Sequence, residues 1–319
     1  MSGFNYTSTN LLADIKRRSF SPISQITFSD QDLLDMADEE LQVGVVPFMM
    51  EVREEYLVAF EDYDIQGTEN QFEVPSRAIG AKLRDVTVLV SPSAQGDQPN
   101  EKSLPQINAE DSVWNNNYNN LISIQSFFLR DNNVVLSPTA SSYAGQTLRL
   151  YYFKRPNKLV LTTNCSQITS ITGSTCTVNL VPTTYGSGNA ISIVSDIVKS
   201  SPPFKLLAMD LNLTIDSTTN TVTFPQDLSN YDIQIGDYVC LQGESPIPII
   251  PVELQSFLAQ RVAVTLLSSL GDAKNFEMAT NRLMSMEKNI RNLISNRVEG
   301  ATHKVVSRFS TFSNGPFRR

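Results

Sequence analysis

Side chains able to act as general bases or nucleophiles are scarce in this sequence. His303 is the only histidine among 319 residues, so a Ser-His-Asp or Cys-His mechanism would have to use it. It follows the last expected helix, in a segment whose pattern offers nothing to hold a base in place. We therefore expect His303 to be solvated or to contact a partner.

The cysteines and acids give no metal or nucleotide signature either. Cys165, Cys176 and Cys240 lack CxxC spacing, and an odd number cannot pair completely within one chain, so we expect three reduced, buried thiols. Phosphate-binding, dinucleotide, zinc-protease and esterase motifs are absent, and Glu61-Asp62-Tyr63-Asp64 matches a calcium loop poorly. Two carboxylates in a cleft need no motif, so a glycosidase remains open. The sequence otherwise predicts no enzyme, no metal and no cofactor.

Charge is distributed unevenly along the chain. The net charge of −8 argues against a protein that binds nucleic acid over its whole surface. Residues 30–64 carry twelve acids against one base, whereas residues 282–319 carry eight bases against two acids. This asymmetry can be two solvated helix faces, or it can steer copies of the chain together. For the second case the candidate inter-subunit residues are Asp35, Asp38, Glu39, Arg291 and Arg297.

Residues 301–319 form a basic tail that also carries phenylalanines. The bases could neutralise DNA phosphates, or the phenylalanines could anchor the tail in a groove of another protein, which we favour. The candidate partner-binding residues are Lys304, Arg308, Phe309, Phe312, Phe317, Arg318 and Arg319.

Helical signals occur near both ends. Residues 1–28 are polar without a sustained period and are expected to form a flexible arm. Ser29 is a suitable N-cap, and an apolar stripe follows, so we predict helices over 30–45 and 47–60 with a kink or a new start at Pro47. Near the other end, Pro251 and Gly271 delimit one helix, and a second begins at Asp272 and ends near Gly300.

Between these helices the apolar period changes to two. A first β region contains the candidate strands 71–74, 85–90, 121–129, 133–136 and 147–153, with a long polar loop over 91–120. A second one contains 167–171, 176–180, 190–194, 211–215, 221–224 and 237–241. Short, regularly spaced strands of this kind are typical of a small sandwich or barrel.

The order of elements predicts an α+β fold. N- and C-terminal helices would pack as a helical base, with a β-rich central region and an inserted small β-sandwich or barrel. The expected divisions are an arm over 1–28, a core over 29–156 plus 246–300, the inserted β domain over 157–245 and the tail over 301–319. No apolar run approaches the roughly 20 residues that span a bilayer, and the start lacks the pattern of a signal peptide.

Two parts of the chain are similar to a known family. The stretch FSDQDLLDMADEELQVGVVPFMMEVREEYLVAFEDYDI resembles the opening helices of head-to-tail connector proteins of short-tailed bacteriophages, and EVPSRAIGAKLRDVTVL resembles the strand–turn–strand that follows. LRLYYFKRP and IPIIPVELQSFLAQRVAVTLLSSLGDA complete the likeness. The resemblance covers residues 27–90, 120–156 and 245–298, and the β stretch 157–245 lies outside it.

The resemblance implies a non-enzymatic adaptor in the virion neck, made in the host cytoplasm. Such a protein forms a ring of about twelve copies under the portal, continues the DNA channel without reading its sequence and serves as a platform for tail proteins. It implies no membrane contact, and it assigns Thr302–Arg319 to the portal. Alternatives are another neck, tail or decoration protein, or a host-surface or carbohydrate-binding module built on residues 157–245.

Overall fold

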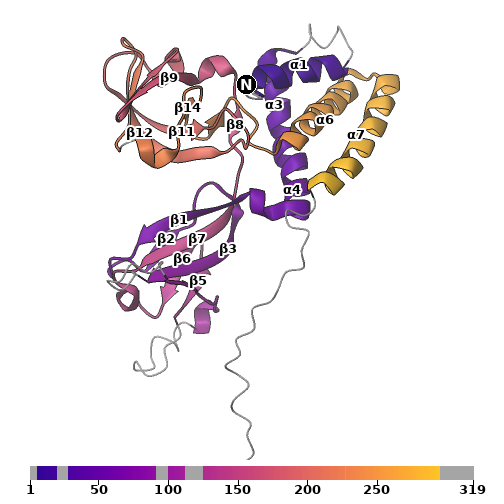
Figure 1. Ribbon diagram of the computed structural model, residues 1–319. Helices are drawn as coiled ribbons and strands as arrows, with labels where there is room; N and C mark the ends of the chain where they lie inside the picture. Colours follow the sequence, from indigo (N-terminus) through magenta and orange to yellow (C-terminus); the bar gives the residue numbers. More distant parts are fainter. Residues whose placement is uncertain (1–5, 20–27, 91–99, 112–124, 227, 295–319) are drawn as a thin grey trace, which may run out of the picture.

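The computed structural model describes residues 6–19, 28–90, 100–111, 125–226 and 228–294 (Figure 1). The chain is a mixture of helix and sheet, with helices at both ends of the described sequence and strands between them. In Figure 1 a group of helices lies beside a β-barrel, and two smaller sheets lie beneath both. The α+β class expected from the sequence is therefore confirmed.

The predicted helix after Ser29 is present. α3 (Asp30–Glu40) begins with a capping box: Ser29 Oγ accepts from the Asp32 amide at 3.2 Å, and the Ser29 amide donates to the Asp32 carboxylate at 2.8 Å. A π-helical turn, η1 (Leu41–Val45), then leads into α4 (Val46–Arg53). The π-turn lies immediately before Pro47, which cannot donate to the helical ladder.

The prediction of helix over 47–60 is wrong at its C-terminal end. A 3-10 turn, η2 (Glu54–Tyr56), ends the helix, and β1 (Val58–Asp64) begins two residues later. β1 pairs antiparallel with β7 along its whole length, from Val58 opposite Phe153 to Asp64 opposite Thr147. A full ladder of backbone hydrogen bonds outweighs the weak helical preference of so short a segment.

The expectation of a flexible arm over 1–28 is also wrong for part of that segment. Residues Ser8–Ser19 form α1, whose Leu11 and Ile15 are completely buried against the helical core. The Ser8 amide donates to the Pro246 carbonyl at 2.6 Å, and Arg18 donates to Gln260 of α6 at 3.0 Å. Apolar residues at i, i+1 and i+4 are enough for one buried stripe when a neighbouring helix receives it.

The C-terminal helices are α6 (Val252–Leu270) and α7 (Ala273–Ile294). Gly271 ends α6 in the left-handed region at φ 70°, and its amide donates to the carbonyls of Leu267 and Ser268. Asp272 then caps α7, since its carboxylate accepts from the Asn275 amide at 3.3 Å. α1, α3, α4, α6 and α7 share one apolar cluster, so the two ends of the described chain are packed together.

The first β region forms two sheets over a common core. The four-stranded sheet has the order β1-β7-β3-β4, and the three-stranded sheet has the order β2-β6-β5. Tyr143 is fully buried in this region, and its hydroxyl donates to the Ser137 carbonyl at 2.6 Å. The further strands are β2 (Gln71–Glu73), β3 (Ala78–Val90), β4 (Asn100–Ser103), β5 (Ser126–Arg130), β6 (Asn133–Ser137) and β7 (Thr147–Lys154).

The second β region is a closed barrel with the strand order β10-β13-β12-β11-β14-β9. Of the two predicted forms, a sandwich or a barrel, the structure therefore shows the barrel. Closure pairs both edges of every strand and leaves no open edge for another chain. Its strands are β9 (Ser166–Thr172), β10 (Thr175–Val178), β11 (Ile191–Val198), β12 (Leu206–Asp216), β13 (Thr221–Thr223) and β14 (Tyr238–Leu241).

Two short parallel strands lie where the chain enters and leaves the barrel. β8 (Lys158–Leu159) pairs with β15 (Glu244–Ser245), so segments 86 positions apart run side by side. Both are adjacent to the helices, because β8 contacts α3 and Ser8 binds the residue after β15. The chain thus enters and leaves the barrel through two adjacent strands, β8 and β15.

Burial in the helical cluster should dominate the stability of the fold. Leu258 in the middle of α6 is completely buried, and truncating it in Leu258→Ala should lower the free energy of unfolding by about 2–5 kcal/mol, because both transfer energy and packing are lost. Urea unfolding followed by circular dichroism measures this. The matched control is Leu293→Ala on α7, whose side chain is 72% exposed and whose change should stay within about 0.5 kcal/mol. Equal effects at the two sites would contradict the assignment of the core.

Candidate functional site

The residues singled out for chemistry do not form a reactive centre in the part of the chain that the structure describes. Cys165, Cys176 and Cys240 are free and buried, as expected, and burial raises the pKa of Cys176 to about 12, so its thiol stays protonated. Across the described residues, no group of three or more His, Cys, Asp or Glu side chains could hold a metal ion. His303 lies outside the described residues.

The acids of β1 are occupied by neighbours on their own sheet. Asp62 receives two hydrogen bonds from Arg149, at 2.7 and 2.8 Å, and the Arg149 guanidinium also lies 4.1 Å from the centre of the Phe60 ring. Glu61 accepts from Tyr63 at 3.0 Å. The segment that resembled a poor calcium loop is therefore a cross-strand pairing surface.

The predicted inter-subunit acids lie on α3, near the connection to the barrel. Asp35 is 3.4 Å from Lys158 of β8, and Asp38 accepts from Gln42 at 2.8 Å. Partial burial raises the pKa of Asp38. Glu39 is exposed on the same helix. The three candidates are consequently unequal: Asp38 is partly enclosed by its own chain, whereas Glu39 remains accessible.

Arg291 is engaged within the chain. Its guanidinium donates to both carboxylate oxygens of Glu51 on α4, at 2.6 and 3.2 Å, and lies 5.4 Å from the centre of the Phe48 ring. It therefore ties α7 to α4 in addition to any role between copies. The structure does not bring Arg291 into contact with Asp35, Asp38 or Glu39 in one chain. Arg297 lies outside the described residues.

The acidic segment as a whole is largely neutralised by internal partners. Glu40 is central: it accepts from Arg261 at 2.8 Å and from Thr265 at 2.6 Å, both on α6. Gly44 leaves the room that the Arg261 guanidinium occupies, because a Cβ there would lie 2.3 Å from that side chain. Further ion pairs join Asp30 to Lys16, Glu54 to Arg84 and Glu55 to Arg53. Many of the acids in this segment are thus paired within the chain, some of them with bases on other helices.

The tail residues proposed to bind a partner cannot be placed. Lys304, Arg308, Phe309, Phe312, Phe317, Arg318 and Arg319 all lie outside the described residues. Their role stays a prediction.

None of the described helices is long and apolar enough to cross a membrane.

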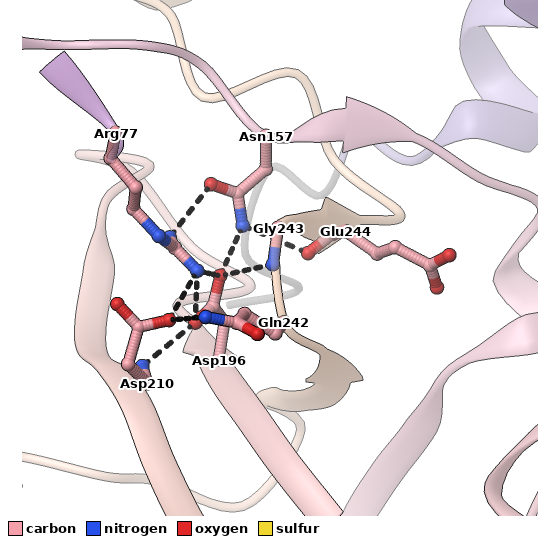
Figure 2. A network of polar contacts seen from close by, with 7 residues as sticks. All are labelled: Arg77, Asn157, Asp196, Asp210, Gln242, Gly243 and Glu244. Carbon is pink, nitrogen blue, oxygen red and sulfur yellow. Dashed lines mark hydrogen bonds and ion pairs between the residues drawn. The ribbon is translucent and has the colours of Figure 1, made fainter.

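A polar cluster that the sequence did not single out fixes the barrel against the sheet (Figure 2). Asp196, in the middle of β11, has no exposed surface. Its carboxylate receives Arg77 Nη2 at 2.8 and 2.9 Å and Asn157 Nδ2 at 2.7 Å, together with the backbone amides of Asp210 and Gly243 at 3.1 and 3.0 Å. We call these five residues the clamp.

The clamp joins parts of the chain that are distant in sequence. Arg77 belongs to the turn between β2 and β3, Asn157 to the connection between β7 and β8, and the rest to the barrel. Arg77 also reaches the Asp210 carboxylate at 2.8 Å, and Asn157 Nδ2 donates to the Glu244 carbonyl at 3.0 Å. A buried carboxylate surrounded only by donors is stable in one arrangement, so the clamp sets how the barrel is oriented.

One sequence signal could have revealed the clamp. β11 reads ISIVSDIV, and Asp196 is its single charged residue, in the half of the strand that is buried throughout. Charged residues are almost never fully buried unless they are paired. Its partners could not have been identified from sequence, since Arg77 is 119 positions away.

Asp196→Asn tests the clamp. The new amide would direct a donor at groups that are themselves donors, and Arg77 would lose its buried partner, so the free energy of unfolding should fall by about 3–5 kcal/mol. Chemical denaturation measures it. The control is Asp232→Asn, which removes a pair with Lys199 at a carboxylate that is 63% exposed and should cost less than about 1 kcal/mol. A loss in Asp196→Asn no larger than in this control would show that the clamp does not anchor the barrel.

Comparisons with known proteins assign no family to the chain. No family model matches the sequence, and a search of curated proteins returns no match. A functional proposal therefore rests on the sequence resemblance together with the described geometry: one helical layer made from both ends of the described chain, a β-barrel clamped beside it, and an acidic segment that is mostly paired.

Proposed function

We propose that this chain is a structural virion subunit, the head-to-tail adaptor of a tailed bacteriophage. Copies would form a ring under the portal, extend the DNA channel and offer a platform for neck and tail proteins. DNA would pass through without sequence-specific contact, and the subunit would act without a cofactor. The helical base would stack side to side with its neighbours, and the β parts would project from it.

The observation that carries this proposal is the packing of α3 and α4 against α6 and α7. α3 and α4 lie in one of the terminal stretches that resemble connector proteins, 27–90, and α6 and α7 lie in the other, 245–298. All four helices share a single apolar cluster. A subunit whose ends close into one layer presents a continuous helical surface, as side-by-side assembly requires. The barrel lies outside the resembling stretches, which is consistent with an addition to such a base.

A carbohydrate-binding module is less well supported. Such a site would need exposed aromatic side chains on the barrel. Tyr185 and Tyr238 are buried there and Tyr231 is half-buried, so none of the three offers an open platform. Another neck or tail protein would share most of the features above and differs from the adaptor in its partner.

Mass photometry of the full chain, alone and mixed with the portal of the same virus, tests the adaptor role. We expect a discrete complex that contains about as many adaptor copies as portal copies, because the ring would form on a template of matching symmetry. A chain lacking Thr302–Arg319 should bind the portal at least about tenfold more weakly if the tail makes the contact. Absence of association with the portal at every ionic strength would contradict the proposal.

Charge reversal separates the steering role of α7 from its role inside the chain. Arg291→Glu combined with Arg297→Glu should slow assembly on the portal about tenfold or more at low salt, because complementary charge accelerates encounter. Arg291→Glu combined with Glu51→Arg keeps an internal pair of reversed order and should also slow assembly. If that exchange restores the normal rate, Arg291 acts only through Glu51.

A further inference from the structure

A cavity of about 580 Å³ lies where the helices, the first sheet and the barrel meet. This volume is within the range of small-molecule sites. Its walls are mainly apolar and come from η2, the end of β7, the turn between β11 and β12, and the segment before α6. The apolar lining residues include Met49, Leu57, Pro203, Phe204, Ile250 and Val252.

Lys154, a cation in this wall, has no hydrogen-bonding or ion-pair partner for its ammonium group among the described residues. Lys154 is the last residue of β7, and its amide donates to the Leu57 carbonyl at 2.7 Å, which fixes the strand end against η2. Within the described part of the chain, its ammonium group forms neither a hydrogen bond nor an ion pair. Burial and, to a lesser extent, the neighbouring Arg77 together lower the pKa of Lys154 to about 8, against the opposing effect of Asp196.

None of the acids around Lys154 forms an ion pair with it in the described part of the chain. Asp196 already accepts from Arg77, Asn157 and two backbone amides. Glu55, also in the cavity wall, pairs with Arg53 at 2.9 Å, and the remaining wall acid, Glu253, is exposed. A partly buried ammonium without a counter-ion is costly, and an anion that enters the cavity would remove that cost.

We propose that this cavity is a binding site for a small amphiphilic carboxylate, in which an apolar body fills the space between Phe204, Ile250 and Val252 and the carboxylate pairs with Lys154. The apolar walls supply affinity, and the ammonium group of Lys154 supplies selectivity for an anion, whereas the other lysine of the wall, Lys205, is exposed. The site is independent of ring formation and of the portal, so its test stands apart from that of the adaptor role.

Two eight-carbon probes, octanoate and octanol, together with the cation octyltrimethylammonium, test the site by isothermal titration calorimetry on the full chain. Octanoate should bind at least about tenfold more tightly than octanol at pH 6.5, because it alone can form an ion pair with Lys154. Octyltrimethylammonium should bind most weakly. The preference for octanoate over octanol should shrink at pH 9.5, since Lys154 loses its positive charge as the pH rises above its pKa.

Two matched variants locate the effect. In Lys154→Met the affinities for octanoate and octanol should agree within about twofold, because the cation is gone and the apolar walls remain. Lys205→Met removes an exposed lysine of the same cavity wall and should keep the preference. Circular dichroism checks that both variants fold, and the pH comparison on the unaltered chain decides the question if Lys154→Met does not. No saturable binding of octanoate, equal affinities in the unaltered chain, or a preference that survives Lys154→Met would overturn the proposal.

Discussion

The carboxylate of Asp196 has no contact with solvent, and this constraint governs how the parts of the molecule are joined. A buried charge is tolerated only when hydrogen-bond donors surround it. Here the donors come from the β2–β3 turn through Arg77, from the connection to the barrel through Asn157, and from the barrel through the amides of Asp210 and Gly243. Rotating the barrel would separate these donors from the charge. Barrel residues Val198, Tyr238 and Cys240 also belong to the apolar cluster of the helices, so the clamp and this packing together limit such a rotation.

The helical layer uses charge in a similar way, nearer to its surface. Glu40 receives Arg261 and Thr265 from α6, and Glu51 receives Arg291 from α7, so acids of the N-terminal half hold bases of the C-terminal half. These contacts cross more than 200 positions of sequence. Of the bases in residues 282–319, Arg291 is the one that these contacts join to the acidic segment, since Arg261 lies outside that basic stretch. The same pairing limits how much charge is left to guide copies toward one another.

The cavity at the meeting point of helices, sheet and barrel is a consequence of this joining. Its apolar wall residues Met49, Leu57, Phe204 and Ile250 all belong to the helical cluster, which does not fill the space between them. Lys154 is in that wall because β7 ends at the junction, and Asp196 cannot neutralise it because the clamp has already used its acceptors. One arrangement of charges thus accounts for both the rigid attachment of the barrel and the unpaired cation beside it.

The sequence by itself determined the elements whose signals are local. Ser29 with Asp32, and Gly271 with Asp272, mark helix boundaries through hydrogen bonds to adjacent backbone, and the short alternating strands between Gln167 and Leu241 indicated a small closed or layered β unit. Tertiary structure decided the rest. α1 is helical because α6 receives its apolar stripe, and Val58–Asp64 is a strand because β7 completes its ladder. Arg77 in the clamp, Arg261 beside Gly44 and Glu51 beside Arg291 are each 119 or more positions from the residue next to which they lie. No local pattern encodes a proximity of that kind.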